Sequence, residues 1–138
     1  MTHSGPGADG SPRADVEVRV PADSAYVSVL RTTTAGLAAR LDFTLDDIED
    51  LRMAVGEASA IVLDAATEGA DLTARFWLGQ RTLTVRVEAP GTGSALGQED
   101  DFAWQVLTTL ADEATSETVA GAYAITLVMA AAPLESGV

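Results

Sequence analysis

The sequence contains no cysteine and no lysine, and its one histidine, His3, lies near the start of the chain. Without cysteine the chain has no disulfide, no thiolate-bound metal or iron–sulfur cluster, and no cysteine nucleophile. This composition is compatible with a reducing cytoplasm. Residues 1–14 are rich in Gly, Pro and Ser, which predicts a disordered tail. A histidine in such a tail is poorly placed for Ser–His–Asp chemistry or for a zinc site.

Basic residues are also scarce. Eight arginines stand against 21 acidic residues, and the formal net charge is −13. Nucleic acids and anionic membrane surfaces are bound through positive patches, so this charge disfavours both and leaves a protein or a small molecule as the partner. The most apolar tract, 119–134, is shorter than the roughly 20 residues of a membrane-spanning helix. No signal peptide is evident. We therefore expect a soluble, cytoplasmic protein.

The 138 residues, 47% of them hydrophobic, suit one domain, which we expect over 15–132, with a C-terminal tail at 133–138. Apolar periodicity and turn residues predict its elements. The first three are a strand at 16–20, a helix from Asp23 or Ser24 to about Leu41, and a helix at 44–66. Strands at 72–78 and 83–89 follow, joined by a turn at Gly79-Gln80, and then a helix opened by Asp101, a short strand near 116–120 and a longer strand at 122–132. The first helix has Tyr26, Leu30, Leu37 and Leu41 on one stripe, and the third helix has Phe102, Val106, Leu107 and Leu110 inward.

Residues 44–66 carry the strongest helix signals. Thr44 is placed to cap the helix, with Asp47 in a near capping box, and Phe43 and Ile48 have the spacing of a hydrophobic staple. Apolar residues then recur at spacings of three and four: Leu45, Ile48, Leu51, Val55, Ala58, Val62 and Ala65. The order β-α-α-β-β-α-β-β predicts an α+β two-layer sandwich, a mostly antiparallel sheet of about five strands with three helices on one face.

The stretch LDFTLDDIEDLRMAVGEA at 41–58, together with this element order, resembles the bacterial anti-sigma factor and serine-protein kinase family of the histidine-kinase-like (Bergerat, GHKL) ATPase fold. The resemblance covers about residues 15–131. Within it, Gly56-Glu57-Ala58 falls where the family carries its N-box glutamate. Arg31 falls where the family has an arginine that meets protein partners.

The nucleotide motifs of that family are incomplete in this sequence. The family's magnesium-binding asparagine, four residues after the glutamate, corresponds to Ile61, which has no oxygen for a hard cation. The family's Asp-x-Gly-x-Gly reads Ala89-Pro90-Gly91-Thr92-Gly93 here, so the glycines remain without the acid. Glu88 is adjacent, but its side chain points to the opposite face of the strand.

The approach to the third helix carries Glu99, Asp100 and Asp101, where the family has donors for phosphate. Carboxylates at a helix N-terminus repel a triphosphate, and the chain has no lysine to compensate. These losses predict a degenerate ATPase fold without a cofactor. ATP and magnesium are expected only if the protein is a kinase after all.

Each candidate residue also has a plain structural interpretation. Glu57 is the family's general base in position, but a solvated helix carboxylate is the favoured interpretation. Arg31 suits either a bidentate contact to a partner's carboxylate or an ordinary solvated arginine. The loop with Gly91 and Gly93 is best explained as a surface loop. Trp104 is expected to pack in the core or at its edge, whereas Trp77 alternates with Phe76 and Leu78, faces outward and is a candidate interface residue.

The leading hypothesis is an anti-sigma factor that sequesters an alternative RNA polymerase sigma factor, without kinase activity, and is released by a STAS-type anti-anti-sigma factor. An acidic protein suits a sigma factor that exposes basic helices. The alternative is an ATP-dependent serine-protein kinase acting on the anti-anti-sigma factor. A third possibility is a nucleotide-free scaffold that dimerises through its sheet edge or Trp77. The family resemblance implies a homodimer.

Overall fold

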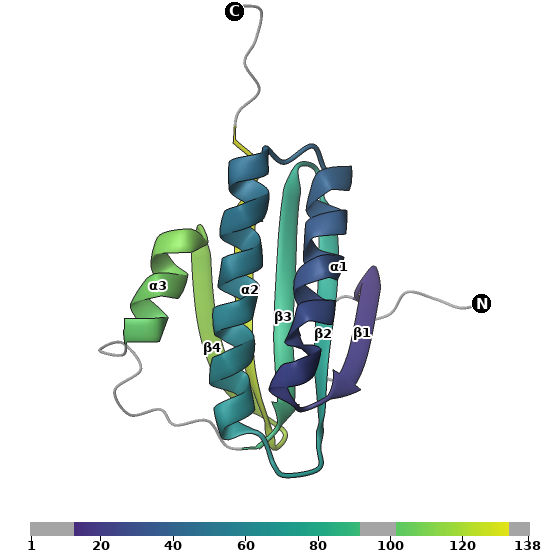
Figure 1. Ribbon diagram of the computed structural model, residues 1–138, viewed down its shortest axis with the longest axis vertical. Helices are drawn as coiled ribbons and strands as arrows, with labels where there is room; N and C mark the ends of the chain where they lie inside the picture. Colours follow the sequence, from purple (N-terminus) through teal and green to yellow (C-terminus); the bar gives the residue numbers. More distant parts are fainter. Residues whose placement is uncertain (1–12, 92–101, 133–138) are drawn as a thin grey trace, which may run out of the picture.

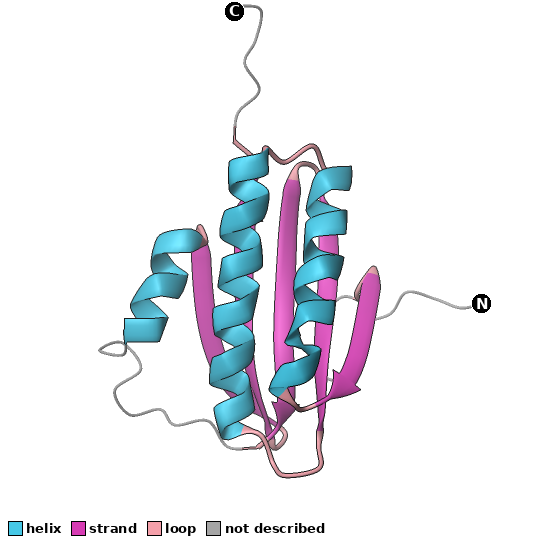
Figure 2. Cartoon of the chain, viewed as in Figure 1, coloured by secondary structure: helices cyan, strands magenta, loops and turns pink. Residues whose placement is uncertain are grey.

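The computed structural model describes residues 13–91 and 102–132 and consists of a helical layer packed on one face of a β-sheet (Figures 1 and 2). Residues 1–12 of the tail predicted at 1–14 and the whole tail predicted at 133–138 lie outside the described residues, as do His3, Gly93 and the acidic residues 99–101. The elements are β1 (Val16–Pro21), a 3₁₀ turn (Ser24–Tyr26), α1 (Val27–Arg40), α2 (Leu45–Ala65), β2 (Asp71–Gly79), β3 (Thr82–Pro90), α3 (Phe102–Leu110), β4 (Glu113–Val119) and β5 (Ala122–Ala130).

The sheet has the order β1-β2-β3-β5-β4, and each neighbouring pair is antiparallel. The last strand, β5, therefore lies between β3 and β4. The helices lie on one face of the sheet, with α3 beside α2 over β4 (Figure 1). This arrangement confirms the predicted α+β two-layer sandwich and its element order.

Helix α2 is the centre of the helical layer, and its predicted start is confirmed. The backbone N–H of Asp47 donates to Thr44 Oγ1 at 3.1 Å, which satisfies one of the free donors at the helix end. Phe43 is buried, and Ile48 packs against the core. The buried side of the helix consists of Leu51, Ala54, Val55, Ala58, Ser59 and Val62.

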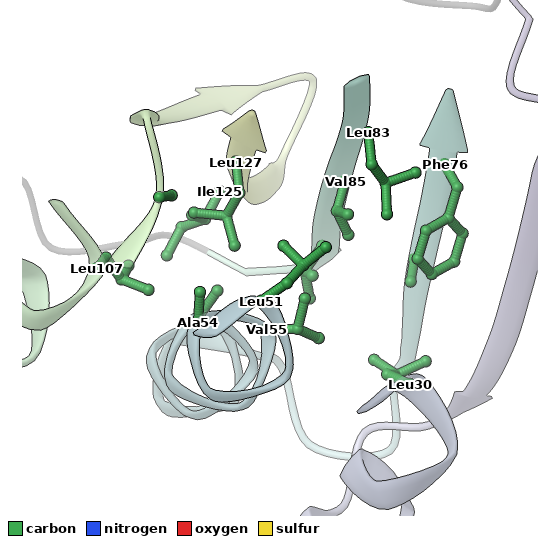
Figure 3. Packing of buried hydrophobic residues seen from close by; sticks show 14 of the residues in the cluster. Leu30, Leu51, Ala54, Val55, Phe76, Leu83, Val85, Leu107, Ile125 and Leu127 are labelled. Carbon is green, nitrogen blue, oxygen red and sulfur yellow. The ribbon is translucent and has the colours of Figure 1, made fainter. Parts of the chain in front are cut away.

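The core lies between α2 and the inner face of the sheet. In Figure 3, Val55 points toward β3 and β2, whereas Ala54 points toward Leu107 on α3. On β5 the inward residues are those predicted to share a face: Tyr123, Ile125, Leu127 and Met129. Each large apolar side chain removed from water in this way stabilises the fold by about 1.5–3 kcal/mol.

Three apolar residues expected in the core are exposed. Tyr26 is 41% exposed, Leu45 81% and Phe102 79%. Tyr26 belongs to the 3₁₀ turn before α1, so the buried stripe of α1 is Val27, Leu30, Thr34 and Ala38 instead. Leu45 and Phe102 are each the first residue of a helix, and the buried residues of these two helices begin only later in each sequence.

Both hairpins also differ from the prediction. Gly79 pairs with Thr82, so the turn between β2 and β3 is Gln80-Arg81 rather than Gly79-Gln80. Strand β4 begins at Glu113, earlier than the predicted 116, because its residues pair with β5 from that point. The β4–β5 turn is Ala120-Gly121, with φ values of 53° and 80°. This is the left-handed conformation that a type I′ hairpin turn needs at both positions.

Arg81, at the tip of the β2–β3 hairpin, joins segments that are far apart in the chain. Its guanidinium donates to the carbonyl oxygens of Asp42 (3.4 Å) and Ala132 (2.5 Å). The N–H of Ala132 donates in turn to Asp47 Oδ2 at 3.0 Å. We call Asp42, Asp47, Arg81 and Ala132 the hairpin clasp. It fixes the α1–α2 loop to the segment after β5.

Among residues 13–91 and 102–132, no helix is both long enough and apolar enough to cross a membrane.

Candidate functional site

Two sides of α2 carry the residues singled out in the sequence. Ala54 faces α3 (Figure 3). Asp50 lies four residues before it, and Glu57 and Ile61 lie three and seven residues after it, which are spacings that share one side of a helix. These three therefore lie on the side of α2 that faces α3. Glu57 is half-exposed, and Ile61 packs against the core.

The strand end that corresponds to the family's adenine-binding motif is closed by packing. Ala89 is 1% exposed and belongs to the hydrophobic core. Gly91 has a φ of 149°, and a methyl group there would lie 1.9 Å from the carbonyl oxygen of Ala65. The N–H of Thr67 donates to the Pro90 carbonyl at 2.8 Å, so the end of α2 is bound directly to the end of β3. Gly91 is therefore required by this close approach of two backbones.

The described part of this side does not fit a magnesium nucleotide. The side chains of Ile61 and the buried Ala89 offer no polar atom to a cation or to adenine. Glu57 and Asp50 are acidic, and α3 carries no charged residue that could balance a triphosphate. Within the described ranges no group of three His, Cys, Asp or Glu side chains could hold a metal ion.

Arg31 lies on the other side of α2. Its Nη1 and Cδ lie 3.3 and 3.4 Å from the point that a side-chain methyl of Gly56 would occupy. The guanidinium thus lies against α2 at Gly56, the one residue of this helix without a side chain. Gly56 faces α1 and Glu57 faces α3, so Arg31 and Glu57 do not form one site.

The surroundings of Arg31 differ in charge from the rest of the molecule. From Ala25 to Leu41 the chain contains no acidic residue, whereas its two charged residues are Arg31 and Arg40. In the part of the chain that the structure describes, the half-buried Arg31 has no hydrogen bond or ion pair. A half-buried guanidinium without a counter-charge is a favourable contact point for a carboxylate.

Other arginines are paired on the sheet face opposite the helices. Arg75 binds Glu17 at 3.1 Å and Glu88 at 2.7 Å, and Arg86 binds Glu88 at 2.9 Å and Glu117 at 2.6 Å. We call these five residues the charge ladder, which runs from β1 to β4. Arg86 is 8% exposed although it lies on this face.

The charge ladder changes the pKa values of its members. Burial alone would raise the pKa of Glu88, but hydrogen bonds from Arg75 and Arg86 and their positive charges hold it below its usual value. Burial alone would lower the pKa of Arg75, yet its contacts with Glu88 and Glu17 raise it. Glu88 therefore stays ionised, and its side chain points away from the Ala89 side, as predicted.

The two tryptophans lie as predicted. Trp104 packs partly buried against the core. Trp77 is half-buried on the sheet face that carries the charge ladder, opposite Thr84 of β3. The charge ladder itself was not predicted. A signal for four of its members was present, because Glu17, Arg75, Arg86 and Glu88 alternate with inward apolar residues along their strands. Glu117 lies between Ser116 and Thr118 and gave no such signal.

Comparison with known proteins gives sequence relatives of one kind, although no family model matches the sequence. A serine-protein kinase RsbW from Halalkalibacterium halodurans is 42% identical over 77 residues, which are 55% of this chain and 48% of that protein. The serine-protein kinase RsbW of Bacillus subtilis is 35% identical over 79 residues, 55% of this chain and 49% of that protein. The matched segment thus spans about half the length of these curated relatives.

Among solved structures, the fold is similar to a crystal structure of the RsbU and RsbW domains of Rv1364c from Mycobacterium tuberculosis. The TM-score is 0.64, and the match covers 88% of this chain and 33% of that chain at 17% identity. At that identity the match establishes the fold.

Proposed function

We propose that the chain, which is similar to RsbW serine-protein kinases over about half of their length, is an anti-sigma factor that acts by protein binding, without kinase activity. Its partners in this proposal are an alternative sigma factor and a STAS-type anti-anti-sigma factor that competes for the same surface. The apolar side chains of Ile61 and Ala89 support a binding role rather than phosphoryl transfer.

The observation that carries the proposal is Arg31, which has no ion pair among the described residues and lies on a helix without acidic residues. The acidic residues all lie outside α1 and give the chain its net charge of −13, which attracts the basic helices of a sigma factor by long-range electrostatics. Arg31 then provides a local contact of opposite sign, a bidentate pair with one carboxylate of the partner. The two effects act on different parts of the surface.

Co-purification tests this function. The tagged chain is expressed with each sigma factor and each STAS protein of its own genome, and retained proteins are identified. We expect Arg31→Ala to weaken capture at least tenfold, because interface arginines are frequent hot spots. Arg40→Ala is the matched control, since it removes the same charge from the exposed end of the same helix. Failure of every candidate to associate above background would argue against the proposal.

A serine-protein kinase remains the second candidate, because the sequence relatives carry that name. Calorimetric titration with magnesium-ATP separates the two. Binding in the micromolar range, together with phosphate transfer to a STAS protein that Glu57→Gln abolishes, would favour the kinase.

We propose further that the protein is a homodimer whose contact is the sheet face with Trp77. The described helices cover only the other face (Figure 2). The charges of the charge ladder are paired with each other, so a second acidic copy is repelled less here than elsewhere. Light scattering should give the mass of a dimer, and Trp77→Ala should shift it toward the monomer. A nucleotide-free scaffold would show this dimer but capture no sigma factor.

A further inference from the structure

We propose that Gly56 is a positioning residue that seats the Arg31 side chain for its contact with a partner's carboxylate. The inference rests on the proposed function, because it concerns how the same surface binds. It assigns a role to a residue beside the N-box glutamate that faces the opposite side of the helix from it.

The geometry shows a gap that fits Arg31. A methyl group on Gly56 would lie 3.3 Å from Arg31 Nη1 and 3.4 Å from Cδ, and both atoms belong to one side chain. No other atom outside the helix's own backbone and the adjoining residues is among its near neighbours. The missing side chain of Gly56 therefore leaves room for the guanidinium and nothing else.

The backbone of α2 gives no reason for glycine at this position. Gly56 lies in the interior of a 21-residue helix, and it is not among the glycines with positive φ. Glycine destabilises a helix interior relative to alanine. Gly36 in α1 is a useful comparison, because a methyl group there would meet nothing within 4 Å.

Filling the gap moves the guanidinium. Alanine at position 56 would press the Arg31 side chain outward by a few tenths of an ångström, which a flexible side chain allows without unfolding. A bidentate pair requires two N–H groups aligned with two oxygens, so a displaced guanidinium binds a carboxylate less well. Gly56→Ala should therefore lower partner affinity while leaving the fold intact.

The first experiment needs no partner. The side-chain Nε–Hε signal of Arg31 is assigned by NMR from the Arg31→Lys spectrum and then followed in Gly56→Ala and Gly36→Ala. We expect it to move in Gly56→Ala and to stay in place in Gly36→Ala. Both variants should melt at or above the wild-type temperature, because each replaces a helical glycine with alanine. An unmoved Arg31 signal in Gly56→Ala, or a lower melting temperature, would overturn the inference.

The second experiment is a double-mutant cycle with the partner captured above. We expect Gly56→Ala to weaken binding about threefold to tenfold with Arg31 present, and less than twofold in the Arg31→Ala background. An equal loss in both backgrounds would show that Gly56 acts independently of Arg31 and would refute the positioning role. If no partner associates, the proposed function itself fails, whereas the NMR result still decides whether Gly56 positions Arg31.

Discussion

Gly91 shows how one residue can satisfy two different explanations. In the sequence it is the first glycine of a degenerate nucleotide loop, and the favoured interpretation was an ordinary surface loop. In the structure, Gly91 bridges to Ala66, and its N–H donates to the Gly121 carbonyl at 2.9 Å. Its position is therefore required by the fold, whether or not a ligand binds nearby.

This requirement predicts the effect of one methyl group. We expect Gly91→Ala to lower the free energy of unfolding by at least about 2 kcal/mol, because the methyl would overlap the Ala65 carbonyl oxygen. Gly69→Ala is the control, since Gly69 also has positive φ but has open space around it, and should lose only about 1 kcal/mol. Urea denaturation measures both. Equal losses would mean that backbone conformation, not the close approach, is what matters.

At the same scale, individual site residues were predictable to very different degrees. Arg31 and Glu57 were found by resemblance, but their orientations on opposite sides of α2 depend on how that helix packs. The contact between Gly56 and the Arg31 side chain could not be predicted, because a glycine within a helical pattern indicates only a locally less stable helix. The partners of an arginine, or their absence, follow from tertiary structure alone.

Among the elements, α2 was predictable because its cap and its apolar period agree. Thr44 and Asp47 form the predicted cap, and the apolar stripe holds except at its first residue. Helix α3 was less predictable. Its composition is nearly all apolar or neutral, so periodicity could not decide which side faces α2, and Phe102 was wrongly placed inward. The β2–β3 turn was shifted by one residue because glycine there ends a strand instead of forming the turn.

The β4–β5 hairpin contains a correctable weakness. Ala120 has a φ of 53°, a conformation that asparagine adopts more readily than alanine, and Gly121 follows it. We expect Ala120→Asn to raise the free energy of unfolding by roughly 0.5–1 kcal/mol. A higher midpoint in thermal unfolding checks this. A Gly121→Ala variant should move the midpoint the other way, and a destabilised Ala120→Asn would contradict the turn assignment.

Across the whole molecule, the charge ladder links the two edge strands over the sheet face opposite the described helices. Arg86 on β3 reaches Glu117 on β4 across the small residues Ala124 and Thr126 of β5, which lie between them in the register. Charge pairs of this kind were visible in the sequence as period-two alternation, but their connectivity depends on the insertion of β5, a feature of topology.

The charge ladder makes stability depend on acidity. The pKa of Glu88 is lower in the folded chain than its usual value of 4.5, so ionised Glu88 stabilises the fold above that pH. This contribution is lost as the pH falls below 4.5 through the folded-state pKa. We expect Glu88→Gln to cost about 1–3 kcal/mol at pH 7 and progressively less below pH 4.5. Thermal unfolding across this range measures the difference.

Glu113→Gln provides the comparison for that experiment. Glu113 is exposed on β4 and belongs to no ion pair among the described residues. Its substitution should change stability by less than about 0.5 kcal/mol at any of these pH values. A pH-independent loss in Glu88→Gln would instead point to altered packing.

The position of β5 has a consequence for synthesis of the protein on the ribosome. Among the described strands, the one translated last lies inside the sheet, so a nascent chain that ends before residue 122 has β3 with one unpaired edge and β4 with no neighbour. Unpaired edges with buried-type residues such as Val85 and Val87 invite aggregation. The sheet, and the hairpin clasp at Ala132, can close only after these residues have left the exit tunnel. The sheet is thereby completed only once β5 has been translated.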